Sequence, residues 1–238
     1  MASISAAVVI RASLGERAWQ CHTVYSKTDI EETPMLFYDS ALPAPNPRRV
    51  RIFLAEKHLR VPMAQISIPK AEHKAEAFLS VNALGQTPAL AFDDGRVLTE
   101  SVAICRYFEV LHPDPPMFGH GAHNIAEIDM WTRRIELRLM TPLSMVWLHT
   151  HPWTARIVKP QYTEFGESQR PRVLAAMAEF DHALDGRDWL DGERYTIADI
   201  VLLTTIDFAT FVGVTMPGEL THLKDWHLRA SARPSAQA

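Results

Sequence analysis

The sequence has 238 residues, 47% hydrophobic and 22% charged, so it can bury a sizeable core in one or two domains. Its net charge is −4 and no basic stripe is interleaved with aromatic residues, which argues against nucleic acid as a partner. No apolar run approaches the ~20 residues of a membrane-spanning helix, and Cys21 and Cys105 form no disulfide framework. We therefore expect a cytoplasmic protein that acts on a small molecule or binds another protein, with no nucleic acid and no membrane.

Residues 1–34 differ from the rest of the chain, being rich in Ala and Ser at first and polar later, and they end at Pro34. They predict either a disordered N-terminal leader or a targeting peptide. A signal peptide is not expected because no charged region precedes the apolar run AAVVI, and the leader is favoured over a transit peptide because Met35 opens the first convincing strand.

The next segment predicts an α/β domain of thioredoxin-like type over residues 35–112. Its elements alternate in the order β-α-β-α-β-β-α. They are a strand over 35–39, a helix over 47–59, a strand over 63–68, a helix over 72–81, two strands within 87–99 joined at Asp94-Gly95, and a helix over 99–112.

The remainder predicts an all-α C-terminal domain over residues 122–238, after a proline-rich linker over 113–121. Its helices are expected over 122–148, 154–184, 196–212 and 220–230. Thr196 and Asp199 have the spacing of a capping box at the start of the third of these helices.

The run LPAPNPRRVR, which follows the first strand, predicts a helix start. Asn is among the best N-cap residues and Pro is favoured at the first helical position, so Asn46-Pro47 marks this start. The backbone amides of Arg48 and Arg49 would then lie in the first turn, next to three cationic side chains. The pattern predicts an anion site, although capping alone is enough to explain Asn46.

A second anion site is predicted at Thr99-Glu100-Ser101, where a strand passes into a helix. Free amides and the Ser101 hydroxyl suit the carboxylate of an amino-acid head group, and Glu100 suits its ammonium. Simple capping by Thr99 or Ser101 explains these residues equally well, and spacing leaves both readings open. Between the two sites, Pro88 opens a strand, which places it at a sheet edge or in a cis turn.

Taken in order, the first strand, APNPRRVRIFLAEK, NALGQTPAL, DDGRVLTESVAICRY, the helical half and TIAD resemble the glutathione S-transferase family over nearly all of residues 35–238. The resemblance implies the two-domain architecture of that family, glutathione as co-substrate, a small electrophile bound between the domains, and a homodimer. It also implies roles in glutathione binding for the residues Arg48, Gln86, Thr87, Pro88 (in cis), Glu100 and Ser101.

The sequence departs from the family where many members carry a catalytic Tyr, Ser or Cys, because the matching serine position is Ala44. Asn46 resembles the Pro-Asn of the bacterial disulfide-reductase-like, or Nu, branch. We expect the Asn46 amide and the helix start to activate the glutathione thiol, with Ser40 or Tyr38 as other donors. The thiolate then attacks an electrophilic carbon or a disulfide; the alternative is a non-catalytic interaction module of the same fold.

Three residues of the first long helix of the all-α domain, Trp131, Arg134 and Arg138, are candidates for the second-substrate pocket because this helix borders that pocket in the family. Periodicity alone predicts Trp131 in the core and the arginines on a solvated face. The histidines form no strong metal-binding pattern, so no metal is expected. Cys105 is expected to be a buried apolar residue rather than a nucleophile.

Overall fold

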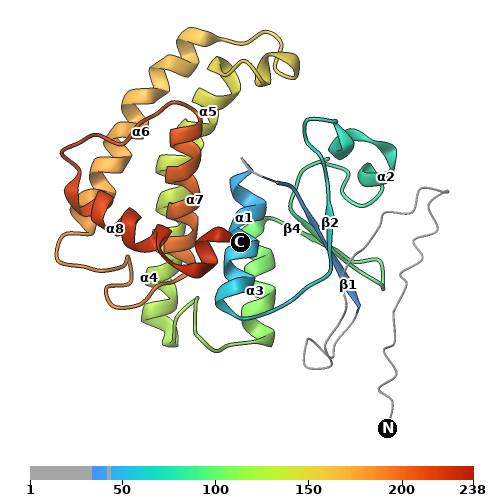
Figure 1. Cartoon of the computed structure of the whole chain (residues 1–238), viewed down its shortest axis with the longest axis horizontal. Helices are drawn as coiled ribbons and strands as arrows, with labels where there is room; N and C mark the ends of the chain where they lie inside the picture. The colour runs from blue at the N-terminus through green and yellow to red at the C-terminus, as the bar shows by residue number, and fades with distance from the viewer. Residues whose placement is uncertain (1–33, 42–43) are drawn as a thin grey trace.

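The structure is a computed structural model that describes residues 34–41 and 44–238, so the predicted leader lies outside the described residues apart from Pro34. An α/β part and a larger helical part lie side by side, with the sheet on the side away from the helical part (Figure 1). This arrangement confirms the predicted fold class: a thioredoxin-like domain followed by an all-α domain.

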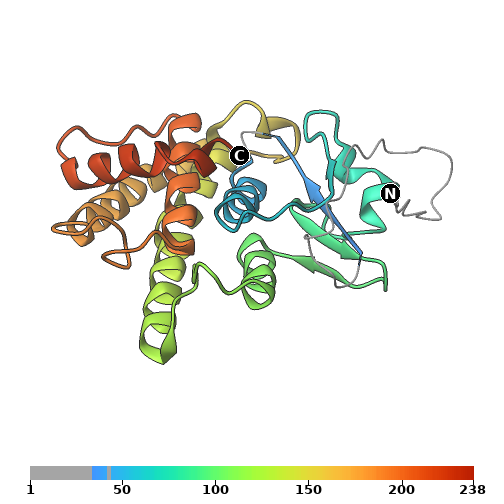
Figure 2. The same cartoon turned by 60° about the horizontal axis from the view of Figure 1, so that its bottom comes forward.

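The α/β part is built on one mixed sheet with the strand order β2-β1-β3-β4. Its strands are β1 (Met35–Asp39), β2 (Met63–Gln65), β3 (Ala89–Phe92) and β4 (Val97–Thr99). β1 is parallel to β2 and antiparallel to β3, and β4 is antiparallel to β3. Helices α1 (Pro45–Glu56) and α3 (Ser101–Leu111) cover the face toward the helical part, and the short α2 (Glu76–Leu79) lies on the other side (Figures 1 and 2).

Several predicted elements of this part are shorter in the structure, including the helix expected over 47–59, which ends at Glu56. The strand expected over 63–68 ends at Gln65. The helix expected over 72–81 is divided into a 3-10 helix, η1 (Glu72–Lys74), and α2, because Ala75 between them has an extended backbone with ψ 146°.

The helical part begins with a continuous helical rod, in which a π-helical segment connects two α-helices. The rod consists of α4 (Gly121–Arg134), η2 (Ile135–Met140) and α5 (Thr141–Thr150). It is followed by η3 (Thr154–Arg156), α6 (Thr163–Ala183), α7 (Ile197–Phe211), α8 (Thr221–Ser231) and η4 (Pro234–Gln237). The predicted helix over 154–184 was wrong at its start, since Pro160 cannot donate a helical hydrogen bond and α6 begins only at Thr163.

One cluster of buried apolar side chains runs through both parts. It includes Phe37 on the sheet, Phe53 on α1, Phe108 on α3 and Leu203 on α7, all 0% exposed. α7 runs through the middle of the helical part and packs against α1 (Figure 1). α1 therefore connects the sheet to the helical core. None of the described helices is long and apolar enough to cross a membrane.

Candidate active site

The predicted anion-binding residues come together at one edge of the sheet. The end of β1 lies beside the start of β3, with Tyr38 opposite Ala89, and the start of β3 lies beside the end of β4, with Ala89 opposite Thr99. The segments that follow or precede these strand ends must share the same edge. Ser40, Thr87-Pro88 and Glu100-Ser101 are therefore neighbours, as is the start of α1.

The loop before β3 has the conformation that the resemblance implied. The Thr87–Pro88 peptide is cis. The Thr87 hydroxyl lies 2.8 Å from the Ser40 hydroxyl, and Ser40 is 1% exposed. Within the described part of the chain, the backbone N–H and C=O of Thr87 have no hydrogen-bond partner. These two groups are free to pair with the backbone of a bound peptide.

The start of α3 has an unusual backbone at Glu100. This residue has a φ of 66°, which is rare for a non-glycine residue, and it occupies the N-cap position without a side-chain capping bond. Neither the Thr99 nor the Ser101 side chain therefore caps α3. The Glu100 side chain is exposed, while the Ser101 hydroxyl is buried and accepts a hydrogen bond of 3.4 Å from Arg49.

The start of α1 differs from the prediction by two residues. α1 begins at Pro45, the N-cap is Ala44, and Asn46 is the second helical residue rather than the cap. The reason is that Pro45 takes the first helical position, for which its φ is suited, and Pro47 is tolerated within the same turn. The backbone amides of Arg48 and Arg49 lie beyond the first turn and bond within the helix.

This helix start leaves Asn46 in an uncommon position. The first three helical residues are Pro45, Asn46 and Pro47, and the two prolines have no N–H. Among these three, Asn46 alone therefore has a backbone N–H, and it is free because it lies in the first turn. The side-chain oxygen Oδ1 of Asn46 is buried and has no hydrogen-bond partner among the described residues. A buried polar atom without a partner is costly unless a ligand or water satisfies it.

Arg49 connects this edge of the sheet to the helical part. Its guanidinium is 3% exposed and lies 3.4 Å from Oε1 of Glu136 on η2. It also contacts the hydroxyls of Thr204 and Thr205 on α7, at 3.3 and 3.4 Å. Burial lowers the pKa of Arg49, and the Glu136 carboxylate opposes that effect.

Comparison with known proteins relates this arrangement to one family. Family profiles for the N-terminal and C-terminal domains of glutathione S-transferase match residues 44–111 and 146–234. Glutathione S-transferase 2 of Saccharomyces cerevisiae is 34% identical over 217 residues, which cover 90% of this chain and 93% of the relative. The chain belongs to the glutathione S-transferase family. It is a transferase that uses glutathione as its co-substrate.

Solved structures support the same assignment. The crystal structure of Gtt2 from Saccharomyces cerevisiae has a TM-score of 0.79 and 34% identity, covering 85% of this chain and 98% of that one. A glutathione S-transferase domain-containing protein from Marinobacter aquaeolei has a TM-score of 0.77 and 32% identity, covering 84% and 98%. The Escherichia coli O157:H7 protein GstA is 28% identical over 71% of this chain and 79% of its own length.

One expected member of the glutathione site, Arg48, is turned toward the helical part. Its Nη1 lies 2.5 Å from Oδ2 of Asp207 on α7, and its Nη2 donates to the carbonyl oxygen of Ala236 at 3.0 Å. These two contacts occupy the guanidinium. The exposed side chain of Gln86 makes no hydrogen bond within the described chain, and its backbone oxygen accepts one from Asn82 at 2.8 Å.

The three candidates for the second-substrate pocket lie together, but no residue of the sheet edge that carries Thr87 and Ser101 lines their groove. Trp131, Arg134 and Arg138 line a groove between the α4–η2 rod and the end of α6, and no residue of the α/β part lines it. Glu136, on the same rod, contacts Arg49 instead. These three residues therefore lie on the side of the rod that faces α6, and their role in binding the second substrate stays a prediction.

A cluster of aromatic side chains at the tip of the helical part was not predicted from the sequence. The His151 ring is stacked on Phe211 at 5.4 Å and lies 4.3 Å from Trp147. Trp153 contacts the same group, 5.6 Å from Phe211, and remains 58% exposed. The signal in the sequence is the run His149-Thr-His151-Pro152-Trp153, which supplies two of the rings.

The aromatic cluster lies toward the end of α1 that carries Asn46. Arg49 contacts Thr204 and Thr205 on α7, whereas Arg48, one residue closer to the start of α1, contacts Asp207. Later residues of α7 therefore lie closer to the start of α1. Phe211 is one turn beyond Asp207 on the same face of α7. Asn46 and Phe211 are therefore placed at the same end of the α1–α7 pair.

Two further sequence predictions concern other chemistries. Cys105 is 0% exposed, and burial raises the pKa of its thiol well above the usual range. This agrees with the prediction of a buried apolar residue rather than a nucleophile. Within residues 34–41 and 44–238, no group of three or more His, Cys, Asp or Glu side chains could hold a metal ion.

Proposed function

We propose that Asn46 activates the glutathione thiol in this transferase. The observation that carries the proposal is the position of Asn46 at the start of α1, with the free backbone N–H of the first turn and a buried side-chain oxygen, Oδ1, that has no partner among the described residues. Both the backbone N–H and the side-chain NH₂ can donate to a sulfur atom, and both lie at the positive end of the helix.

The energy required is comparable with what these groups supply. Lowering a thiol pKa from about 8.5 by two units costs about 2.7 kcal/mol. A helix N-terminus contributes about 0.3 to 1 kcal/mol, rising to about 2 in favourable geometry, and one hydrogen bond to a charged group about 1.5 to 3. Neither contribution is comfortably sufficient alone, but together they stabilise the thiolate at neutral pH.

The rest of glutathione is proposed to bind along the same sheet edge. Thr87 offers its free backbone N–H and C=O to the cysteinyl part, next to the cis Pro88. Ser101 and Glu100 hold the γ-glutamyl carboxylate and ammonium, and the exposed Gln86 reaches the glycyl carboxylate. Ser40 is enclosed and paired with Thr87, which supports a role in positioning this loop rather than in contacting the sulfur.

The second substrate is proposed to be a small apolar electrophile bound at the aromatic cluster. Exposed and half-buried rings of Trp153, His151 and Phe211 offer flat surfaces near the start of α1. The thiol proton leaves to solvent, the thiolate forms an S–C bond, and the leaving group departs with the bonding electron pair. With a disulfide as the electrophile, the thiolate instead forms an S–S bond and releases the other sulfur as a thiolate. Conjugation of this kind is the chemistry of detoxification.

The decisive experiment compares wild type with Asn46→Ala and Ser40→Ala. Glutathione binding is measured by titration calorimetry, and turnover is measured with an aromatic halide and with a hydroxyethyl disulfide. We expect Asn46→Ala to lower kcat at least tenfold on the preferred substrate, equivalent to about 1.4 kcal/mol of transition-state stabilisation. Ser40→Ala should reduce kcat by less.

Other results would point elsewhere. If Asn46→Ala turns over as fast as wild type while Ser40→Ala loses activity, Ser40 is the activating group and the proposal is wrong. A chain that bound glutathione without turning over either substrate would match the interaction module considered from the sequence.

A homodimer in the cytoplasm is proposed as the working form. Val110 on α3 and Leu137 on η2 are 77% and 66% exposed, which is a high exposure for large apolar side chains. A second copy of the chain would cover them. A free, buried Cys105 supports a reducing compartment.

A further inference from the structure

The C-terminal end of the chain packs against α1, the helix that carries Asn46. The C-terminus lies beside α1 in two views of the molecule (Figures 1 and 2), and η4 contacts this helix directly. Ser235 and Ala236 of η4 are 8% and 4% exposed, so this segment is enclosed by the rest of the protein. Residues 233–236 are called the C-terminal strap below.

The strap is attached to the last residue of α1, Glu56. Arg233 donates to both carboxylate oxygens of Glu56, at 2.8 and 2.7 Å, and the Ser235 hydroxyl donates to the same carboxylate. Burial raises the pKa of Glu56, but the hydrogen bonds from Arg233 and Ser235 outweigh burial and lower it. The guanidinium of Arg233 also lies 4.2 Å from the ring centroid of Tyr195. A charged, bidentate contact therefore anchors the strap at this end of α1.

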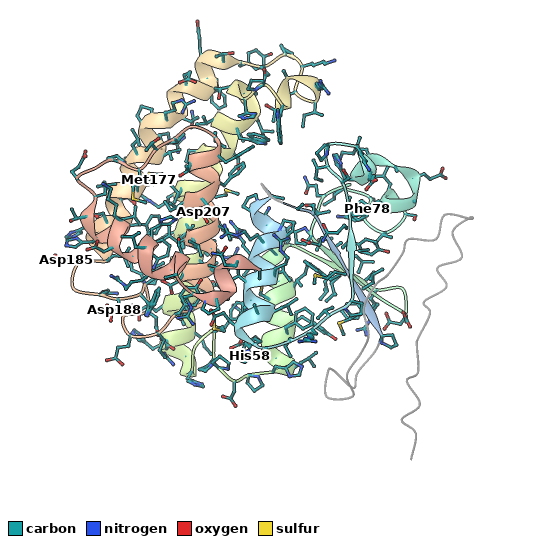
Figure 3. All side chains as sticks on the ribbon, in the orientation of Figure 1. His58, Phe78, Met177, Asp185, Asp188 and Asp207 are labelled. Atoms are coloured by element: carbon teal, nitrogen blue, oxygen red, sulfur yellow. The ribbon has the colours of Figure 1, made fainter. Side chains whose placement is uncertain are left out.

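The strap also reaches the start of α1, through Arg48. Nη2 of Arg48 donates to the carbonyl oxygen of Ala236 at 3.0 Å, and its Nη1 lies 2.5 Å from Oδ2 of Asp207 on α7. Asp207 in turn lies 2.7 Å from Nε2 of His227 on α8. Figure 3 shows Asp207 toward the start of α1, whereas His58 lies beyond the end of this helix. Two acceptors from different elements therefore fix the Arg48 guanidinium.

These contacts lie on the side of α1 away from Asn46. Two residues separate Arg48 from Asn46 along the helix, which places the two side chains about 200° apart around its axis. Arg48 thus holds the helix start from behind and leaves the face of Asn46 free.

The helix start has few other contacts that fix its position. Its N-cap residue, Ala44, makes no side-chain capping bond among the described residues, and Pro45 and Pro47 have no N–H. Within residues 34–41 and 44–238, Arg48 is the first residue of α1 whose side chain forms hydrogen bonds. The place of the first turn therefore depends on Arg48 and on what holds it.

We propose that Arg48 is a positioning residue of the active site, through which Asp207 and the C-terminal strap hold the start of α1 and, with it, Asn46. The inference rests on the proposed role of Asn46 in activating the glutathione thiol. Arg48 acts through the helix and does not contact the sulfur. A donor to the sulfur is effective only at a defined distance and angle, so a shift of the first turn lowers the rate.

The test uses two changes that release the start of α1. Arg48→Met keeps the aliphatic part of the side chain and removes the guanidinium, and a chain that ends at Arg233 lacks η4. The matched controls are Arg172→Met, at an exposed arginine of α6, and a chain that ends at Ala236, which keeps the acceptor of Arg48.

Three quantities are measured for each protein: kcat, KM for glutathione, and the pKa of the bound glutathione thiol, followed by the ultraviolet absorbance of the thiolate. We expect Arg48→Met and the chain that ends at Arg233 to lower kcat about tenfold and to raise the pKa of the bound thiol, with KM within about twofold of wild type. Both controls should match wild type. A purely structural role would leave the pKa of the bound thiol unchanged.

The same two changes are then made in the Asn46→Ala background. There they should lower kcat by at most about threefold, because the side-chain donor that they position is already absent. The proposal is overturned if the two changes leave kcat or the pKa of the bound thiol as in wild type, or if they lower kcat equally in both backgrounds. If the shortened chain does not fold, Arg48→Met and Asp207→Asn decide in its place.

Failure of the proposed function gives a different result. Asn46→Ala alone would then be as active as wild type. In that case a raised thiol pKa in Arg48→Met still supports the positioning of the α1 start, whereas an unchanged thiol pKa overturns it.

Discussion

At the scale of single residues, the prolines around Asn46 explain why one side chain stands out at the start of α1. Pro45 and Pro47 remove two of the free amides that a helix start usually offers, which leaves the N–H of Asn46. The cap position, Ala44, has no polar side chain. Any donor for a sulfur atom at this helix start therefore comes from Asn46 itself.

Asp199 is a buried carboxylate whose protonation is expected to affect stability. It is 0% exposed and accepts hydrogen bonds from the backbone of Leu190 and Thr196, the Thr196 hydroxyl and the Trp226 indole. Burial raises the pKa of Asp199 to about 6, while these hydrogen bonds oppose the rise. The folded chain therefore holds a proton at pH values where the unfolded chain has lost it.

The sign of the pH dependence follows from that difference. Between about pH 4 and pH 6, the free energy of unfolding should rise as pH falls, by at most about 1.4 kcal/mol per unit from this group. The contribution is lost as pH rises through 6. We expect urea unfolding to show that the advantage of wild type over Asp199→Asn shrinks between pH 4.5 and pH 7. A difference that stays constant across this range would contradict the assignment.

At the scale of elements, one capping box and one hairpin were predictable from local patterns. Thr196 and Asp199 form the predicted capping box at the start of α7, and the hairpin at Asp94-Gly95 connects β3 and β4 as expected. Segments without strong local signals were less predictable. The π-helical segment η2 interrupts a run that reads as one regular helix, and nothing in its composition marks it.

Arg49 connects α1 to three other elements, and its loss should destabilise their contact. The guanidinium of this α1 residue contacts Ser101 on α3, Glu136 on η2 and two hydroxyls on α7. Arg49→Met keeps the length of the side chain but leaves these polar groups without their donor. We expect urea unfolding to show a loss of about 2 to 3 kcal/mol.

The control for that variant is Arg172→Met on the exposed side of α6, where a surface change should stay within about 0.5 kcal/mol. If Arg49→Met is no less stable than this control, the cost of burying the charge offsets all that its hydrogen bonds contribute.

At the scale of the whole molecule, the exposed apolar residues of α3 and η2 predict how copies of the chain assemble. Wild type is expected to elute with twice the 26.9 kDa chain mass in size-exclusion chromatography with light scattering. Leu137→Glu should shift it toward the monomer, because a charge at the interface is desolvated without a partner. Leu228→Glu, at a similarly exposed position on α8, is the control. A monomeric wild type, or a dimer unaffected by Leu137→Glu, would rule out this interface.

The sequence by itself determined the family, the two-domain fold class, the hairpin turn at Asp94-Gly95 and the capping box of α7, because these depend on residues that are close together in the chain. Proline, glycine and capping residues restrict the backbone locally, and their order along the chain was enough for the resemblance. It also indicated Asn46, Thr87, Pro88, Glu100 and Ser101 as candidates, and the sheet brings the segments around them to one edge.

Only the tertiary structure decided which way the long side chains point and what faces the site. Arg48 turns to Asp207, 159 residues later in the chain, and Trp131, Arg134 and Arg138 line a groove with α6 rather than with the α/β part. The aromatic cluster combines α5, η3 and the end of α7, which no local pattern connects. The facing of a helix depends on its packing partners, and those partners are distant in the sequence.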